Sequence, residues 1–179
     1  MPLKSTYRDQ DCSVAATLEV VGERWTLLVV RSVMLGSHRF EELRAALGIA
    51  TNVLQARLTR LVDEGILERR AYQEHPPRWE YRLTEKGLAL WPVIASLNVW
   101  GDAYLRDKPP LIFRHRDCGG AVDDHRICAS CGERLEVADV IAEAGPGASP
   151  NHRLRRSGPR PLTASSSSPP AAPFRPPAR

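Results

Sequence analysis

Apolar residues in the first part of the chain recur at the three- and four-residue spacing of an amphipathic α-helix. The first such segment places Val14, Leu18 and Val21 on one face. Asp11 is its expected N-cap and Gly22 its expected stop. Three further segments show the same spacing, and a glycine follows each of them. We therefore expect additional helices over residues 24–35, 40–47 and 52–64, the last of them capped by Thr51.

The apolar pattern changes to an alternating period after residue 66. Residues 67–73 and 78–84 predict two strands, and the Pro-Pro loop between them suits an exposed turn. This predicted hairpin, the wing of the fold proposed below, carries four arginines. They are Arg69, Arg70, Arg78 and Arg82.

A long helix is expected after the hairpin, with Thr84 as its N-cap. Its apolar face includes Trp91, Trp100 and Tyr104, and Pro92 predicts a kink or an early turn. Four helices, a hairpin and a long helix follow one another in the order of a winged helix-turn-helix. We predict a mainly α fold with a small β-hairpin.

Composition divides the chain into three zones. Residues 8–107 hold the predicted helices and hairpin, residues 111–140 hold three of the four cysteines, and residues 145–179 are rich in Pro, Arg and Ser. The last zone contains nine of the fifteen prolines. Such a segment cannot bury enough apolar surface to offset its ordering entropy, so we predict a disordered tail.

The net charge of +4 comes from the tail. Residues 1–110 carry 15 basic and 14 acidic residues, and residues 111–145 carry 4 basic and 7 acidic residues. Residues 146–179 carry 6 basic residues and no acidic residue. Of the 25 cationic residues 22 are Arg, whose planar fork suits phosphate and guanine. A codon-composition bias towards Arg is the alternative explanation.

The chain begins with charged residues where a signal peptide would need an apolar run, and its longest apolar stretch is too short to cross a bilayer. We expect a cytoplasmic protein without a membrane segment. In that reducing compartment, paired cysteines favour metal binding or redox chemistry over structural disulfides.

The helix predicted over residues 52–64 is the second of the helix-turn-helix pair, the one that enters the major groove of DNA. With Leu54 and Leu58 facing the core, a rotation of about 100° per residue places small and polar side chains opposite them. Arg57, at the edge of the core face, is expected to brace the wing, which is the predicted hairpin of residues 67–84. The alternative interpretation is that this polar helix face is simply exposed to solvent and that the domain is a protein-interaction scaffold. The candidate DNA-contacting residues are Thr51, Asn52, Gln55, Ala56, Thr59, Arg60, Arg69, Arg70 and Arg78.

Several local motifs point to one family. They are Cys12 followed by LEVVGERWTLL (18–28), RFEEL (39–43), EGIL (64–67) and YRLTEKG (81–87). Across residues 11–106 the chain resembles the HxlR-type winged-helix transcriptional regulators of bacteria. The resemblance implies a homodimer held by its first and last helices and bound to an inverted repeat in DNA. The family's recognition helix usually begins with Ser and a basic residue, where this chain has Ala-Thr-Asn (50–52).

The aromatic face of the last helix also favours a homodimer. Trp91, Trp100 and Tyr104 form more aromatic surface than a small domain usually exposes to solvent, so a second copy of the chain is expected to cover it. Packing on the chain's own first helix is the alternative. The cysteine that matches Cys12 senses oxidants or electrophiles in some HxlR-type members, so the resemblance implies a redox-sensing role. A helix N-terminus lowers a thiol pKa, whereas nearby aspartates raise it. A small buried cysteine without this role remains the alternative.

The remaining three cysteines have the spacing of a compact zinc ribbon, His115-x2-Cys118-x9-Cys128-x2-Cys131. His125 is the rival for the fourth ligand position. A metal-free thiol switch and a thiol-disulfide oxidoreductase that uses the CASC motif are the alternatives. A segment of about thirty residues with few apolar side chains needs a cross-link or a bound metal to fold, so we predict structural zinc.

No glycine-rich phosphate loop, activated nucleophile or acid–base carboxylate pair is evident in the sequence. The sequence therefore predicts a dimeric DNA-binding transcriptional regulator and not an enzyme. Double-stranded DNA and a second copy of the chain are its expected partners. An oxidant or a small molecule is the candidate effector.

Overall fold

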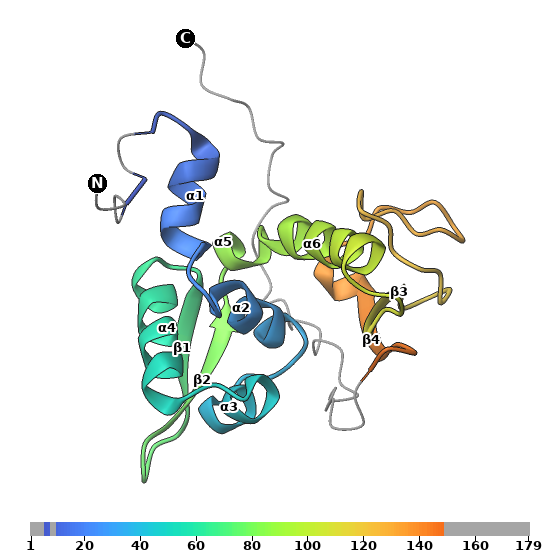
Figure 1. Cartoon of the computed structure of the whole chain (residues 1–179). Helices are drawn as coiled ribbons and strands as arrows, with labels where there is room; N and C mark the ends of the chain where they lie inside the picture. Colours follow the sequence, from blue (N-terminus) through green and yellow to red (C-terminus); the bar gives the residue numbers. More distant parts are fainter. Residues whose placement is uncertain (1–5, 8–9, 149–179) are drawn as a thin grey trace, which may run out of the picture.

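The computed structural model describes residues 6–7 and 10–148 and places a winged helix-turn-helix beside a small two-stranded extension (Figure 1). Its fold is mainly helical with a small antiparallel hairpin, as predicted. The winged helix consists of α1 (Ser13–Val21), α2 (Thr26–Met34), α3 (Phe40–Leu47), α4 (Thr51–Asp63), β1 (Leu67–Gln73), β2 (Arg78–Leu83), α5 (Glu85–Leu88) and α6 (Trp91–Tyr104). The extension consists of β3 (Leu111–His115), the 3-10 turn η1 (Val137–Asp139) and β4 (Val140–Ala144).

Two helices begin at residues other than those predicted. Cys12, and not Asp11, is the N-cap of α1, because the Ala16 N–H donates to the Cys12 carbonyl at 3.0 Å. Ala50 is the N-cap of α4, and Thr51 is the first helical residue. Neither helix has a side-chain cap, so backbone geometry alone marks where it starts.

The prediction of one long final helix after Thr84 is wrong, because the structure has two helices there, α5 and α6. Thr84 does cap α5, with its side chain accepting a hydrogen bond from the Gly87 N–H at 3.1 Å. Pro92 lies in the first turn of α6. A proline lacks the N–H that would continue a helix but is tolerated in a first turn, so the break falls immediately before it.

The helical core is formed by α2, α3 and α4. Leu54, Leu58 and Leu61 of α4 are fully buried, as are Val29 and Val30 of α2. β1 and β2 pair in antiparallel register and close one side of this core. The predicted strands and the turn between them are confirmed by this hairpin.

The extension packs against α6 through an aromatic contact. β3 and β4 pair in antiparallel register. Trp91 of α6 is 1% exposed, and its ring meets Phe113 of β3 edge to face, with centroids 5.1 Å apart. The prediction that Trp91 belongs to an outward aromatic face is therefore wrong, because the extension covers this residue. Figure 1 shows the extension and the α4–wing region on opposite sides of the molecule.

Residues 145–148 fold back onto the start of the extension. The Gly145 N–H donates to the Pro110 carbonyl, and the Gly147 N–H donates to the Pro109 carbonyl, each at 3.1 Å. The remainder of the tail predicted to be disordered, residues 149–179, lies outside the described residues. Among the described residues, no helix is long and apolar enough to cross a membrane.

Candidate functional site

The exposed face of α4 carries small and polar side chains. Thr51, Asn52, Gln55, Ala56 and Thr59 are all exposed, on the side of the helix away from its buried leucines. The Gln55 side-chain amide donates to the Thr59 hydroxyl at 3.4 Å. Five of the predicted DNA-contacting residues therefore form one continuous exposed face.

Two arginines of α4 turn towards the rest of the protein. Arg60 donates to the Glu19 carbonyl of α1 at 3.3 Å and forms an ion pair with Glu64 at 3.0 Å. Arg57, predicted to brace the wing, is instead paired with Glu23 in the α1–α2 connection. The two arginines therefore connect α4 to α1 and to the segment between α1 and α2.

The wing places its two consecutive arginines on opposite faces. Successive residues of a strand alternate between the two faces of the sheet. Arg69 shares a face with Trp79, and its guanidinium carbon lies 3.9 Å from the centroid of that ring. Arg70 lies on the other face and is paired with Glu68 at 2.5 Å. Arg78 is exposed where β2 begins.

Trp79 is a feature of the site that the sequence analysis missed. It is 38% exposed, and its ring supports the guanidinium of Arg69. Ala71 pairs with Trp79, so the alternating pattern of the hairpin could have placed Arg69 and Trp79 on the same face. A cation–π contact of this kind restricts the arginine without neutralising its charge.

Cys12 lies exposed at the N-terminus of α1. Hydrogen bonds from the backbone N–H groups of Ala15 and then Val14 lower the pKa of the Cys12 thiol, and slight desolvation opposes them. The thiolate is the reactive form of cysteine, so this environment favours reactivity.

The other three cysteines and His115 gather at the end of β3. Their ligand atoms all lie within 4.8 Å of one another. His115 Nδ1 is 3.2 Å from Cys118 Sγ and 3.3 Å from Cys131 Sγ, and Cys118 Sγ is 3.3 Å from Cys128 Sγ. Zinc–sulfur bonds of about 2.3 Å put the sulfurs of a tetrahedral site about 3.8 Å apart. The cluster can therefore hold one metal ion.

His115, and not His125, gathers with the three cysteines. The His125 side chain is 82% exposed and lies 3.9 Å from Asp124. His115 is 4% exposed, with Nδ1 towards the sulfurs and Nε2 3.8 Å from a Glu133 carboxylate oxygen.

Glycines and backbone N–H groups shape the cluster. Gly119 and Gly132 have φ of 72° and 75°, a conformation that residues with a Cβ rarely adopt. A Cβ on Gly120 would lie 2.3 Å from Cys128 Sγ, so the backbone passes directly beneath this sulfur. The N–H groups of Cys131 and Ser130 help to lower the pKa of Cys128 to about 6, against desolvation. The thiolate, which is the metal-binding form, is thereby favoured.

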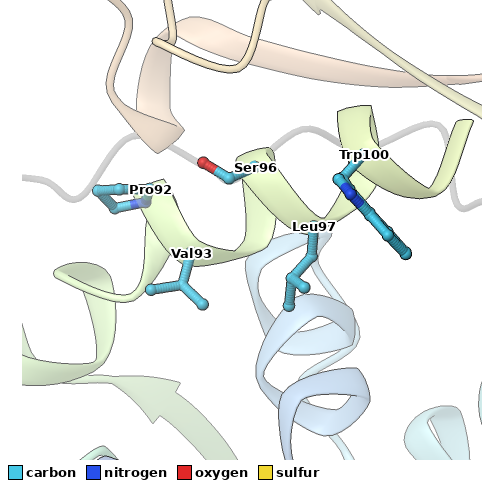
Figure 2. A pocket seen from close by; sticks show the side chains of 5 residues that line it. All are labelled: Pro92, Val93, Ser96, Leu97 and Trp100. Carbon is cyan, nitrogen blue, oxygen red and sulfur yellow. The ribbon is translucent and has the colours of Figure 1, made fainter. Parts of the chain in front are cut away.

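The outward face of α6 is apolar and has no cover within the described chain. Figure 2 shows Val93, Leu97 and Trp100 pointing to the same side of the helix. Together with Pro92 and Ser96 they line an open groove of about 490 Å³. Leu97 is 51% exposed and Trp100 54%, and Tyr104 continues the face, with its ring centroid 5.5 Å from that of Trp100. On α1, Val14 and Leu18 are exposed as well.

Comparisons with known proteins agree with this architecture. The chain is 44% identical over 144 residues to the uncharacterized HTH-type transcriptional regulator Rv3095 of Mycobacterium tuberculosis (strain ATCC 25618 / H37Rv), covering 79% of this chain and 91% of that protein. A span of that length necessarily includes the metal cluster. The HTH-type regulator YvaP of Bacillus subtilis is 37% identical over 89 residues, covering 49% of this chain and 82% of YvaP.

Two solved structures have similar folds. The crystal structure of PA1607 is 36% identical, with a TM-score of 0.61, and the match covers 74% of this chain and 94% of that one. The redox regulator HypR in its oxidized form is 35% identical, with a TM-score of 0.50, and the match covers 54% of this chain and 99% of the HypR chain. The family model described as HxlR-like helix-turn-helix matches residues 20–109, which run from the last two residues of α1 to just beyond the end of α6. The chain belongs to the HxlR-like helix-turn-helix family of DNA-binding transcriptional regulators.

Proposed function

We propose that the chain regulates transcription as a homodimer that reads an operator through the exposed face of α4. Residues 8–107 form the DNA-binding and dimerisation domain in this proposal, and residues 111–140 form a metal-binding extension. The observation that carries it is the exposure of Asn52, Gln55 and Ala56 opposite the buried leucines of α4. Because the leucines fix the rotation of α4, this face is always presented outward.

Each side chain on this face has a partner in the major groove. The amides of Asn52 and Gln55 match the donor–acceptor pair of adenine, and the methyl groups of Ala56 and Thr59 suit the thymine methyl. Thr51 lies in the first turn of α4, where free backbone N–H groups favour a phosphate. Arg60 is a weaker candidate, because it is already bound to Glu19 and Glu64.

Arg69 is the strongest wing candidate for a backbone or minor-groove contact. Trp79 holds its guanidinium in place without neutralising it, and Arg78 adds charge at the start of β2. Arg70 is a poorer candidate, since it lies on the opposite face and is paired with Glu68.

A second copy of the chain is the partner that best fits the outward face of α6. Val93, Leu97, Trp100 and Tyr104 follow one another at helical spacing, and α1 adds Val14 and Leu18. An apolar face of this kind on a regulator that recognises an inverted repeat suits a two-fold symmetric dimer. The groove beside Trp100 also offers room for a small apolar effector.

Zinc is the metal that the ligand set favours, because three thiolates and one imidazole that fill all four tetrahedral positions are typical of structural zinc. His115, Cys118, Cys128 and Cys131 would hold it. Its proposed role is to stabilise a segment too poor in apolar residues to fold alone.

Cys12 is the proposed thiol sensor of the winged helix. Its lowered pKa and its exposure support this role. HypR, a solved structure with 35% identity, is named a redox regulator and is described in its oxidized form.

DNA binding across a salt series tests the proposal, with the DNA upstream of the chain's own gene as the probe. The variants Arg69→Ala and Arg70→Ala remove the same charge from opposite faces of the wing. We expect Arg69→Ala to weaken binding roughly tenfold and to lower the salt slope by about one, because a phosphate contact is lost. Arg70→Ala should change the affinity by less than about twofold, as is usual for exposed pairs.

Base reading is tested separately by Asn52→Ala. Loss of an amide pair with adenine should cost about 1–3 kcal/mol on the specific site and leave non-specific binding unchanged. Equal effects of the two wing variants, or loss of non-specific binding in Asn52→Ala, would contradict the proposed interface. DNA affinity with no specific site and a weak salt slope would favour a protein-interaction scaffold instead.

A further inference from the structure

The metal cluster is open on one side. Cys118 and Cys131 are exposed, whereas Cys128 is 1% and His115 4% exposed. The sulfur atoms of the two exposed cysteines lie 3.7 Å apart. A small reagent in solution can therefore reach two of the four ligands while the protein stays folded.

The segment that contains the cluster also holds α6 in place. The Trp91 indole N–H donates to the Leu135 carbonyl at 3.1 Å, and its ring packs on Phe113. Further along the helix, the Ser96 hydroxyl donates to the Asp124 carbonyl at 3.2 Å. Phe113 lies in β3, Asp124 lies between Cys118 and Cys128, and Leu135 follows Cys131, so the partners of α6 are interspersed with the candidate metal ligands.

This segment depends on the cluster for its own structure. From β3 to β4 its buried apolar side chains, apart from Cys128, are Leu111, Phe113, Leu135 and Val140. A unit of this size and composition needs a cross-link or a metal to stay folded. Loss of the metal would therefore remove the cover from the Trp91 side of α6.

We propose that the cluster is an oxidation-sensitive lock on α6: oxidation of Cys118 and Cys131 to a disulfide releases the metal, frees α6 and weakens operator binding. This inference rests on the proposed metal site and on the proposed dimer. It adds to the regulator a second thiol sensor, which is independent of Cys12.

The step is a two-electron oxidation by a hydroperoxide, with hydrogen peroxide as the simplest example. One exposed thiolate attacks the peroxide oxygen, giving a sulfenic acid and a hydroxide ion that takes up a proton to form water. The second thiolate attacks the sulfenic sulfur and expels another hydroxide, which is likewise protonated. Two thiolates lose two electrons in all, one peroxide becomes two water molecules, and the divalent ion leaves with two of its four ligands lost.

The consequence for DNA follows from the two faces of α6. Trp91, Ile94 and Ala95 face the protein, while Val93, Leu97 and Trp100 form the proposed dimer face. A helix that is no longer held on one side cannot present the other side in a fixed orientation. A loosened dimer no longer holds two recognition helices at the spacing of an inverted repeat.

The experiment uses the full chain and its Cys12→Ser variant, both loaded with zinc, and hydrogen peroxide as the oxidant. Zinc release is followed with a chromogenic chelator, disulfides are mapped by mass spectrometry, and DNA affinity is measured before and after oxidation. We expect about one zinc released per chain in both proteins, a disulfide between Cys118 and Cys131, and an affinity loss on the order of tenfold. Chelator under reducing conditions should weaken DNA binding equally, because metal loss is the common cause.

Matched variants separate the possible failures. Cys131→His keeps a zinc ligand but removes one thiol, so it should bind zinc, resist oxidative release and keep its DNA affinity in peroxide. A chain that binds no zinc overturns the metal site and the inference with it. Zinc that stays bound after oxidation, a disulfide that involves Cys12, or unchanged DNA affinity after zinc release each overturns the lock while leaving the metal site intact.

Discussion

At the scale of single residues, the geometry of the cluster of His115 and three cysteines depends on a glycine that is not one of its candidate ligands. A Cβ on Gly120 would approach Cys128 Sγ to 2.3 Å and Ser130 Oγ to 2.7 Å. Gly120→Ala should therefore displace the Cys128 ligand and lower zinc affinity by about 10–100-fold, the usual effect of disturbing the surroundings of a metal site. Competition with a chelator of known affinity measures this loss.

Gly101→Ala in α6 is the matched control for this substitution. A Cβ there meets nothing within 4 Å, so zinc affinity should stay unchanged. Alanine should also stabilise the helix slightly relative to glycine, by about 0.5–1 kcal/mol. Equal zinc affinity in Gly120→Ala and the unmodified chain would show that the Cys128 sulfur is not held where the structure places it.

Cys12 should react with alkylating reagents at a lower pH than the same thiol in the unfolded chain. Backbone N–H groups of Ala15 and Val14 lower the pKa of the folded thiol, so its thiolate persists as the pH falls towards neutral. The rate of modification of the Cys12 peptide by iodoacetamide, measured across pH by mass spectrometry, reports this midpoint. A folded midpoint equal to or above that in urea would remove Cys12 from the proposed sensing role.

The wing shows why some residue positions could be predicted from the sequence and others could not. Strand and turn boundaries follow from the alternating pattern and the two prolines, and they agree with the structure. The same alternation separates Arg69 from Arg70, which the sequence analysis placed together as candidates. Arg60 was also a candidate, and its contact with Glu19 depends on the distant helix α1. No local spacing reveals a contact of that kind.

At the scale of elements, α6 marks the limit of periodicity as a guide. Its aromatic residues were assigned to one outward face, yet Trp91 is buried and Trp100 is 54% exposed. Helical spacing indicates which residues share a side, but not which segment covers each side. The cover on Trp91 comes from Phe113 and Leu135, which follow the winged helix in the chain.

The outward face of α6 should control the oligomeric state. Leu97→Asp places a charge in the middle of the proposed dimer face, where burial of an unpaired carboxylate is strongly unfavourable. We expect the dimer to dissociate at micromolar concentrations while the helical content stays unchanged, as measured by sedimentation and circular dichroism. Tyr72→Asp, an equally large change at an exposed residue of the wing, should leave the dimer intact.

The outcome of the Leu97 experiment also bears on DNA binding. A monomer contacts only one half of an inverted repeat, so operator affinity should fall together with the dimer fraction. A Leu97→Asp chain that remains dimeric would show that the copies meet through another surface. In that case the groove beside Trp100 would be left as a candidate effector site.

At the scale of the whole molecule, charge and specificity are divided between different parts of the chain. The first 110 residues are nearly neutral, with 15 basic and 14 acidic residues. Residues 111–145 are acidic, with 4 basic and 7 acidic residues. The proposed reading of bases by α4 uses the amides of Asn52 and Gln55 and the methyl groups of Ala56 and Thr59, which carry no charge. We therefore expect general attraction to DNA to come from the wing arginines and from the six arginines after residue 145.

Removal of residues 149–179 tests this division. The truncated chain keeps every described element and should melt at the same temperature, but it loses six arginines and no acidic residue. Each phosphate contact that disappears should reduce the slope of log affinity against log salt by about 0.9. We expect a shallower slope and weaker binding to non-specific DNA, with an unchanged preference for the operator over other sequences. An unchanged slope would mean that the tail does not contact DNA, and a lost preference would mean that the tail itself takes part in reading the operator.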